Sequence, residues 1–303
     1  MTRDRVLAIA ILGPVAIAAM FSLTRLAAAN RHVPRPADYE AIAGLLRAEG
    51  IDASTDAIAV LPPWSLRPYQ YLTDLSPISG DDLAQQPLDR YRRLFTIVEP
   101  DSDQYMRPLV NRLGKPASIA RIGALELDRF ELPARDVRFD FRRRIAAADI
   151  TLADVQTGRR AAACDHRILN GYGCGGRPWW QRVDREWLYI TANGDEAIWA
   201  HPPPLGERLE ILFADVTLGA RLVLRAGFTP VAAAHSQVPL RFTVRVDDVE
   251  AVREELRPIV GYRALNVDTR RWRSGTHRVT FVTQSEGPNR YHHFAFDAYT
   301  VDP

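Results

Sequence analysis

The residues best suited to chemistry in this chain are two adjacent tryptophans, Trp179 and Trp180, which follow the turn-forming sequence GGRP. Aromatic rings stack on the C–H faces of sugars, and an exposed pair on a loop can serve as a binding platform. We therefore predict a glycan-binding site at Trp179 and Trp180. Trp187 and Trp199 stand inside strand-like runs and are expected in the hydrophobic core instead.

A pair of acidic residues offers a second kind of chemistry. Asp101 and Asp103 directly follow the apolar run LFTIV, in the sequence VEPDSD. Paired carboxylates in such a place can hold a divalent metal in enzymes that transfer sugars from nucleotides. The competing interpretation is that Ser102 or Asp103 caps the helix that follows. Because two carboxylates alone do not complete a metal site, Asp101 and Asp103 are only candidate ligands, and neither a metal nor a cofactor is predicted.

Other catalytic patterns are missing from the sequence or stay open. No G-x-S-x-G motif marks a serine nucleophile. His292 and His293 are adjacent in a strand-like run, so their side chains are expected on opposite faces, where they cannot share a metal. A glycosidase pair among the many Asp and Glu residues stays open, because the separation of two carboxylates in space decides that chemistry.

The chain has only two cysteines, Cys164 and Cys174, which bracket the polar, glycine-containing segment CDHRILNGYGC. We predict a disulfide between them, and in the chain-entropy model a loop of this size gains roughly 3 kcal/mol. Such a bond requires an oxidising compartment. Two alternatives remain, a pair of unlinked structural thiols and a metal site that also uses His166.

Residues 6–23, VLAIAILGPVAIAAMFSL, form an uncharged and almost wholly apolar run that indicates where the protein is located. As a helix this run spans about 27 Å, close to the ~30 Å hydrocarbon core of a bilayer. We predict a single-pass anchor in the inner membrane, with the body of the protein outside the cytoplasm. A cleaved signal peptide is the alternative, because Arg3 and Arg5 precede the run and residues 27–29 are alanines.

Charge and composition exclude one class of partner. The chain has 39 Lys and Arg against 37 Asp and Glu, for a formal net charge of +2, and the two signs are interleaved along the sequence. Nucleic-acid binding, which needs a basic stripe, is therefore not expected. The densest basic cluster, RRR at 142–144, is interpreted as a solvated strand end, with a phosphate or lipid-headgroup site as the less favoured alternative.

A small α/β domain is predicted over residues 36–132, after an anchor and a proline-containing linker at 1–35. Helical periodicity and short apolar runs alternate along this part, which favours a mostly parallel sheet. No glycine-rich loop follows the first two runs, so nucleotide binding is disfavoured. The expected elements are helix 37–49, strand 57–61, strand 94–98, a helix that begins at Ser102 or Asp103 and closes at Gly114, and strand 118–127.

An antiparallel β-sandwich is predicted over residues 133–303, which makes the whole chain an α+β multidomain protein. Residues there alternate between apolar and polar in several runs, as in strands with one buried face. Segment 249–256, VEAVREEL, is expected as one or two helical turns at the edge. The alternating runs are VRFDF at 137–141, LEILF at 209–213, LRFTVRV at 240–246 and RVTFV at 278–282.

Five successive segments of the sandwich carry a family resemblance, namely IWAHPPP, LEILFADVTLGARLVLRAGF, LRFTVRVDD, WRSGTHRVTFVTQS and HHFAFDAYTVD. Over residues 185–303 this succession resembles the galactose-binding-like jelly-roll modules of bacterial envelope proteins. Residues 37–127 are also similar to the soluble, extracytoplasmic portion of membrane glycosyltransferases that use lipid-linked sugars. Because this chain lacks the membrane-embedded catalytic half of those enzymes, the second resemblance implies a part that works beside such chemistry without performing it.

Three functions follow from these observations. The favoured one is a non-enzymatic envelope protein that binds a glycan or a protein partner through its sandwich, as an accessory in the assembly of surface polysaccharide or of the envelope. The second is an envelope carbohydrate-active enzyme, a glycosyltransferase or a glycosidase, that uses carboxylates such as Asp101 and Asp103. The third is a scaffold subunit without a small ligand.

Overall fold

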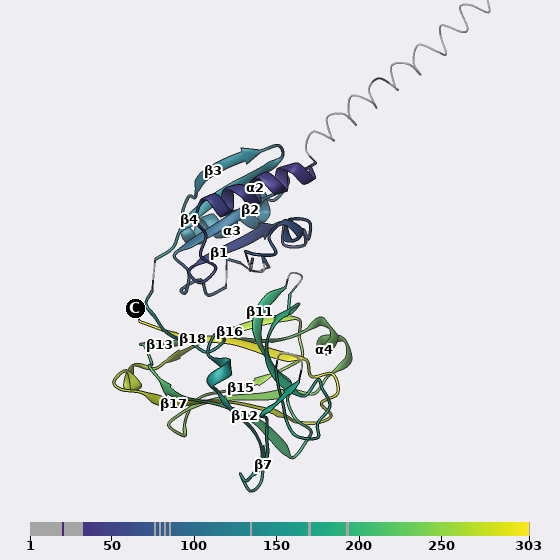
Figure 1. The fold of residues 1–303 in the computed structure, drawn as a ribbon, viewed down its shortest axis with the longest axis vertical. Coiled ribbons are helices and arrows are strands. Elements are labelled where there is room, and N and C mark those ends of the chain that lie inside the picture. The colour runs from purple at the N-terminus through teal and green to yellow at the C-terminus, as the bar shows by residue number, and fades with distance from the viewer. Residues whose placement is uncertain are drawn as a thin grey trace, which may run out of the picture.

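The computed structural model describes Met20 and residues 33–302, apart from residues 76, 79, 82, 85, 134, 169, 170, 192 and 193. These residues form two stacked bodies, a small α/β layer and a larger β-sandwich (Figure 1). The predicted anchor at 6–23 lies, but for Met20, outside the described residues. Within the part of the chain that is described, no helix is both long and apolar enough to cross a membrane.

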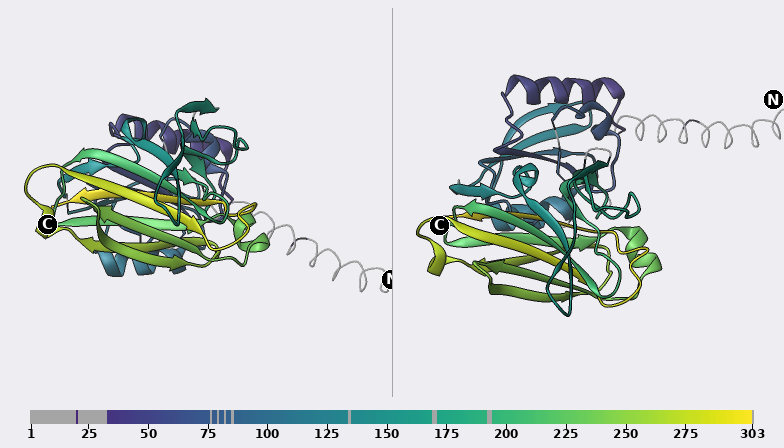
Figure 2. Two further views of the ribbon diagram at one scale, coloured as in Figure 1. Left: turned by 90° about the horizontal axis from the view of Figure 1, so that it is seen from below. Right: turned by 60° about the horizontal axis from the view of Figure 1, so that its bottom comes forward.

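The small α/β layer is a four-stranded sheet in the order β1-β2-β4-β3, covered by one helix on each face (Figure 2). In Figure 1 β1 lies nearest the sandwich and β3 farthest from it. The predicted helix 37–49 and strands 57–61 and 94–98 are confirmed within a residue or two. The elements are α2 (Pro36–Ala48), β1 (Asp56–Leu61), β2 (Arg93–Val98), α3 (Asp103–Leu113), β3 (Ala117–Ile122) and β4 (Leu125–Glu131).

Two predictions about this sheet are wrong. It is mixed rather than mostly parallel, because β1 and β2 are parallel while β4 runs antiparallel to both β2 and β3. The single strand expected at 118–127 is instead a hairpin that turns at residues 123 and 124. Gly123 has a φ of +58°, a left-handed conformation that glycine adopts without steric cost. A turn at this glycine reverses the chain and therefore produces two antiparallel strands.

The sandwich consists of two antiparallel sheets, as predicted. One sheet has the order β16-β13-β18-β11-β10-β9-β8, with β5 also paired to β18, and the other has the order β15-β14-β17-β12-β6-β7. The strands are β5 (Val137–Asp140), β6 (Asp149–Asp154), β7 (Arg160–Ala163), β8 (His166–Ile168), β9 (Gly171–Gly173), β10 (Arg182–Leu188), β11 (Asp195–Ala200), β12 (Glu207–Val216), β13 (Arg221–Phe228), β14 (Leu240–Val246), β15 (Val249–Leu256), β16 (Gly261–Asp268), β17 (His277–Ser285) and β18 (Phe294–Val301). Short helices are α4 (Pro230–His235) and the 3₁₀ helices Pro68–Tyr71, Ile145–Ala147 and Arg270–Trp272.

Segment 249–256, expected as helical turns, is strand β15. Between β14 and β15 stand only Asp247 and Asp248, and both have positive φ, at 48° and 66°. A two-residue turn with both φ values positive is a type I′ turn, which matches the twist of a β-hairpin. The turn therefore sends the chain back along β14, and pairing with β14 overrides the local helical propensity of the segment.

Phenylalanines fill the space between the two sheets. The Phe281 ring lies 4.7 Å from the ring of Phe296 and 4.8 Å from that of Phe141, measured between centroids, and all three are buried. Each such side chain contributes about 1.5–3 kcal/mol by leaving water. Because side chains alternate along a strand, the residues between these core positions on β13 and β18 project from the outer face of the eight-stranded sheet, toward the small α/β layer.

The predicted disulfide between Cys164 and Cys174 is confirmed, with the Cα atoms 3.8 Å apart and both residues buried. Cys164 directly follows β7 of the six-stranded sheet, and Cys174 directly follows β9 of the eight-stranded sheet. The disulfide thus links the two sheets at one edge of the sandwich.

Candidate functional site

A groove of about 460 Å³ opens between the two bodies, a volume typical of small-molecule sites. Its walls come from two parts of the chain far apart in sequence, the segment after β1 and the hairpin of β10 and β11. In Figure 1 this hairpin rises from the sandwich toward the small layer. The lining residues are Leu66, Tyr69, Gln70, Leu72, Thr73 and Pro77 on one side and Trp187, Tyr189 and Gly194 on the other.

Trp187 lies in this groove and not in the core, so its predicted position is wrong. It pairs with Glu196 near the tip of the hairpin, whereas β11 pairs with β18 only at Ile198 and Trp199. The tip therefore overhangs the sheet, and 40% of Trp187 is exposed. Trp199, further down the hairpin, is buried as expected and donates its indole N–H to the Trp180 carbonyl at 3.1 Å.

The indole of Trp187 is held against the backbone of the same hairpin. A methyl group placed on Gly194 would collide with the Trp187 indole nitrogen, so the ring occupies space that only a glycine leaves open. Tyr189, two residues further on, is 57% exposed. The hairpin thus presents two aromatic side chains to the groove, and the first of them packs against the hairpin backbone at Gly194.

The lining of the groove suits an uncharged ligand with both apolar and hydroxyl surface. None of the described lining residues carries a charge. Trp187, Tyr189 and Tyr69 offer aromatic faces, and Gln70 and Thr73 are exposed amide and hydroxyl groups on the opposite wall. Aromatic stacking combined with a few polar groups that fix orientation is the chemistry by which proteins bind sugars.

A second hollow, of about 420 Å³, adjoins the groove at Leu66, which lines both. It contains the Glu99 carboxylate, which accepts hydrogen bonds from the Tyr39 hydroxyl at 2.7 Å and the Ser65 hydroxyl at 2.6 Å. Burial, together with the hydrogen bond to Glu99, raises the pKa of Tyr39 well above its usual range, so this hydroxyl remains a donor. The exposed Trp64 completes the hollow, which extends the aromatic surface beyond the groove.

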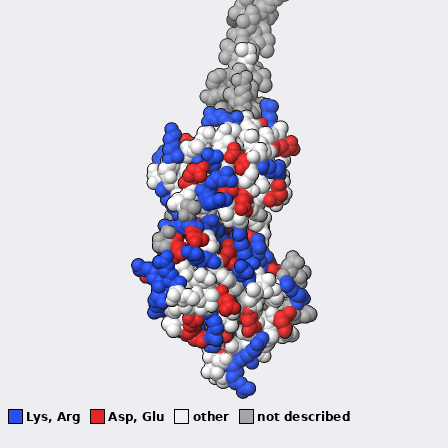
Figure 3. All heavy atoms as spheres, turned by 60° about the vertical axis from the view of Figure 1, so that its left-hand side comes forward, with Lys and Arg blue, Asp and Glu red and all other residues white. Residues whose placement is uncertain are grey.

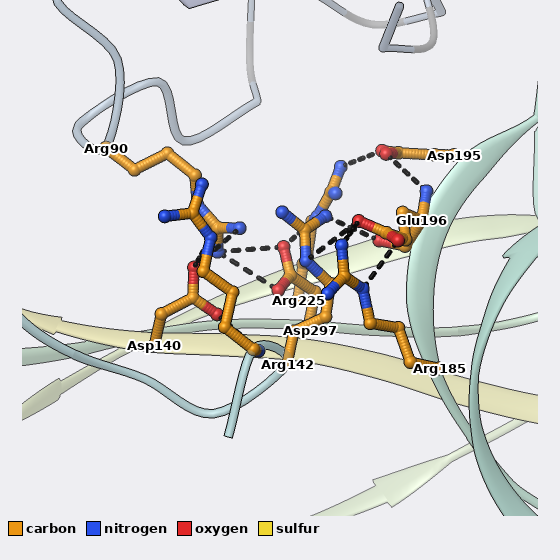
Figure 4. Close-up of polar contacts among 9 residues, drawn as sticks. Arg90, Asp140, Arg142, Arg185, Asp195, Glu196, Arg225 and Asp297 are labelled. Atoms are coloured by element: carbon orange, nitrogen blue, oxygen red, sulfur yellow. Dashed lines mark hydrogen bonds and ion pairs between the residues drawn. The ribbon is translucent and has the colours of Figure 1, made fainter. Parts of the chain in front are cut away.

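A buried cluster of charges clamps the two bodies together (Figure 4). Arg90, in the turn before β2, extends to the outer face of the eight-stranded sheet, where its Nη2 lies 2.9 Å from Asp297 Oδ2 on β18. Arg225 on β13 contacts the same carboxylate at 3.2 Å and Asp195 on β11 at 2.6 Å. The Arg90 guanidinium also lies 4.0 Å from the centre of the Tyr299 ring. The side chains of all four charged residues are at most 8% exposed.

The charges in this cluster compensate one another. Burial opposes ionisation of Asp297, but Arg90, Arg142 and Arg225 outweigh that effect and hold its pKa below the usual range. Burial likewise opposes the charge on Arg90, and the carboxylates of Asp297 and Asp140 raise its pKa. Because Arg90 and Asp297 belong to different bodies, this pair joins the two bodies that form the walls of the groove.

Trp179 and Trp180, the predicted platform, do not form a flat pair and do not line the groove. Their rings are nearly perpendicular, at 85°, with centroids 6.1 Å apart. Trp179 is 59% exposed, whereas Trp180 is half-buried. The Arg182 guanidinium lies 5.4 Å from the centre of the Trp179 ring, which leaves one tryptophan face for a ligand at this loop.

Asp101 and Asp103 are both exposed at the start of α3. Asp101 has a φ of 63°, and Ser102 occupies the N-cap position without a capping hydrogen bond from its side chain, while Gly114 ends the helix as predicted. Across the described residues, no three His, Cys, Asp or Glu side chains are grouped so that they could hold a metal ion. The two aspartates thus lie on the surface, outside the set of residues that lines the groove.

His292 and His293 precede β18 instead of lying within it, so the expected strand alternation does not apply to them. The two ring nitrogens of the buried His292 lie 3.0 Å from the Ser285 hydroxyl and 2.9 Å from the Val238 carbonyl. Burial lowers its pKa, which favours the neutral ring. His292 therefore has a structural role in linking neighbouring loops.

Sequence reasoning missed the clamp, although its residues left a signal. Arg225 in RLVLRAGF and Asp297 in FAFDAYTV each interrupt an otherwise apolar strand. A charge in such a position needs a buried partner. A charged residue inside an apolar strand is therefore the sequence signal that indicates such a cluster. Arg142 of the RRR cluster is also buried and donates to the Glu196 carbonyl at 2.9 Å, so the interpretation of that cluster as wholly solvated is wrong.

No protein-family model matches the chain, and no curated protein matches it in sequence. Similar solved structures include the CBM51 module of Clostridium perfringens GH95 in complex with methyl-galactose, with 13% identity, a TM-score of 0.27, and coverage of 50% of this chain and 80% of that one. The Caldicellulosiruptor saccharolyticus module CBM27-1 in complex with mannohexaose has 11% identity and a TM-score of 0.33, and the match covers 55% of this chain and 96% of that one.

A third match is the structure of CBM51-2 in complex with GlcNAc and INT domains from Clostridium perfringens ZmpB, at 15% identity and a TM-score of 0.29. It covers 39% of this chain, which spans only 25% of that structure. At such TM-scores and identities the matches define neither the family nor the ligand of this chain. The predicted similarity of residues 37–127 to membrane glycosyltransferases finds no support among these structures.

Proposed function

We propose that this chain is a glycan-binding protein whose groove between the small layer and the sandwich holds a neutral sugar chain. The observation that carries the proposal is the pair of exposed aromatic side chains, Trp187 and Tyr189, in an uncharged groove of about 460 Å³. Sugar rings stack on Trp187, and hydroxyl groups bond to Gln70 and Thr73. The adjoining hollow at Trp64 accepts further units of the chain, with Glu99 as a fixed acceptor.

We further propose that the sandwich is a galactose-binding-like jelly roll and that residues 6–23 anchor the protein in the inner membrane, with the body outside the cytoplasm. The disulfide between Cys164 and Cys174 supports an oxidising location. A single anchored glycan-binding body fits an accessory role in the assembly of surface polysaccharide. A cysteine introduced by Ala37→Cys tests the topology. It should react with an impermeant maleimide in cells with a permeabilised outer layer, and reaction only after lysis would contradict the proposed orientation.

A glycan array probed with the full chain in detergent tests the ligand class. We expect binding to neutral oligosaccharides, with galactose-containing ones as the first candidates because of the jelly-roll resemblance. Trp187→Ala should weaken binding at least tenfold, since the variant loses the stacking surface. The matched control is Trp179→Ala, which removes an exposed tryptophan outside the groove and should bind as the wild type does.

The two variants separate the two candidate surfaces. If Trp179→Ala loses binding and Trp187→Ala keeps it, the loop of Trp179 and Trp180 is the site and the groove is not. If neither variant changes the affinity, neither Trp187 nor Trp179 carries the binding, and the role assigned to Trp187 is wrong. If no glycan on the array binds the wild type, the proposed function itself is wrong.

A further inference from the structure

A second pocket, of about 390 Å³, lies where the two bodies meet, and its described lining residues include six arginines and a single carboxylate. Figure 3, which views the molecule from the side of the C-terminus, shows charged side chains gathered where the two bodies meet. The pocket is built from the turn before β1, the turn before β2 and the β5 region. Its charged residues are Arg90, Arg92, Arg135, Arg138, Arg143, Arg144 and Asp140.

The carboxylates that pair with these arginines do not neutralise the pocket, because several of them also serve arginines outside it. Asp89 lies 2.6 Å from Arg135 and 3.1 Å from Arg221. Asp297, the partner of Arg90, is shared with Arg225 in the same way. Each shared carboxylate offsets only part of the charge of the arginine that faces the pocket. Arg138 is neutralised, because it contacts two carboxylates, Asp136 at 3.1 Å and Asp302 at 2.9 Å. The excess of positive charge in the pocket therefore comes from the other arginines.

Two of the arginines have no carboxylate within 4 Å among the described residues. Arg92 is exposed and donates a hydrogen bond to the Thr55 hydroxyl at 2.8 Å, and Arg144, also exposed, lies 6.0 Å from the centre of the Phe139 ring. At the inner wall, the Nη1 of Arg90 is buried without a hydrogen-bond partner, 3.7 Å from an Asp140 oxygen. The pocket therefore offers guanidinium donors that no described residue satisfies.

The pocket also has an apolar part, formed by Val137 and Phe139. Guanidinium groups bind carboxylates and phosphates through paired, charge-assisted hydrogen bonds. A bare inorganic anion would leave the apolar wall uncovered, whereas a sugar that carries an oxyanion covers both parts of the pocket. The ligand that this lining fits is thus an acidic sugar unit.

We infer that this arginine pocket is a second binding site, for a sugar unit that bears a carboxylate or a phosphate. The inference goes beyond the proposed function and rests on it only for the sugar part of the ligand. The uncharged groove and the arginine pocket both lie where the two bodies meet. The protein therefore takes neutral sugar units in the groove and acidic sugar units in the pocket.

Titration calorimetry on the full chain in detergent tests this inference with four probes: trigalacturonic acid, its neutral analogue galactotriose, galactose 6-phosphate and inorganic phosphate. The variant Arg92→Ala/Arg144→Ala removes the two arginines without a carboxylate partner. Arg107→Ala/Arg121→Ala is the matched control, because it makes the same change in net charge at exposed positions outside the pocket lining. Circular dichroism and the melting temperature of each variant establish that it is folded.

We expect an acidic sugar, trigalacturonic acid or galactose 6-phosphate, to bind more tightly than galactotriose, and its binding to weaken in 0.5 M salt. Arg92→Ala/Arg144→Ala should weaken acidic-sugar binding at least tenfold and leave galactotriose unchanged, while the control binds as the wild type does. Trp187→Ala should have the opposite selectivity, so a failure of the groove and a failure of the pocket are distinguishable.

Three results would overturn the inference. The first is that neither acidic sugar binds more tightly than galactotriose. The second is an equal loss of acidic-sugar binding in both double variants, which would mean a general effect of net charge. The third is that inorganic phosphate binds as tightly as galactose 6-phosphate, which would show that the sugar does not contribute to binding.

Discussion

The clamp between Arg90 and Asp297 leads to a prediction about stability. Asp297→Asn keeps the size of the side chain but removes its charge. Arg225 retains Asp195 at 2.6 Å, whereas Arg90 is left with Asp140 at 3.7 Å as its nearest carboxylate. Removing one partner of a buried ion pair costs about 3–5 kcal/mol, because the other charge stays buried without compensation. We expect a loss near 3 kcal/mol, since Arg225 stays paired.

In a protein of this size such a loss lowers the melting temperature by roughly 5 °C. The effect should also depend on pH in a defined direction. The pKa of Asp297 is lower in the folded than in the unfolded protein, so its stabilising contribution is present above the unfolded value of about 4 and disappears as the pH falls through the folded value. The difference between wild type and Asp297→Asn should therefore be full at pH 7 and smaller below pH 4.

Urea unfolding followed by circular dichroism at pH 7 and pH 3 measures this difference. Asp149→Asn is the control, because it removes an aspartate whose ion pair with Arg160, at 3.7 Å, lies on the surface, and its unfolding midpoint should match that of the wild type. A difference for Asp297→Asn below about 1 kcal/mol at pH 7, or one that is the same at both pH values, would refute the role assigned to the clamp.

Three further predictions concern the groove and the sandwich. Reduction of the bond between Cys164 and Cys174 should destabilise the sandwich by about 2–4 kcal/mol, measured as a lower melting temperature with reductant, and an unchanged melt would show that the link between the sheets carries no stability. Gly194→Ala should displace the Trp187 ring, shift the tryptophan fluorescence and weaken neutral-glycan binding about tenfold; unchanged fluorescence would contradict the described contact. Phe281→Ala should cost about 3–5 kcal/mol in urea unfolding because it opens a cavity between the sheets, and a loss under 1 kcal/mol would mean that the core is not packed there.

Much of the fold was predictable from the sequence, because the spacing of apolar residues along a helix or strand follows which of its faces is buried. The runs at 57–61 and 94–98 are strands, and the alternation at 209–213 and 240–246 places one face of each strand in the core. The two cysteines bracket a polar, glycine-containing loop, which favoured a disulfide over unlinked thiols or a metal site, and the disulfide is present. Reversals of the chain were harder to place, since Gly123 is one of several glycines and only the partner strand determines which of them turns.

The site was less predictable because it depends on contacts between distant parts of the chain. Trp187 lies in a strand-like run and was therefore expected in the core, and only the overhang of its hairpin exposes it. Trp179, by contrast, has the local signature of an exposed loop residue and is exposed, yet it does not line the groove. Local sequence thus predicts exposure at Trp179 but cannot predict which exposed or half-exposed aromatic ring meets the opposite wall.

The proposal that neutral glycans bind between the two bodies is tested most directly by NMR. The indole N–H resonances of the six tryptophans, assigned by single substitutions, are recorded while an oligosaccharide that binds the full chain is added in steps. We predict that the Trp187 resonance moves most as the groove fills. A Trp187 resonance that stays fixed while that of Trp179 or Trp180 moves would contradict the proposal, and would place the glycan on the loop instead.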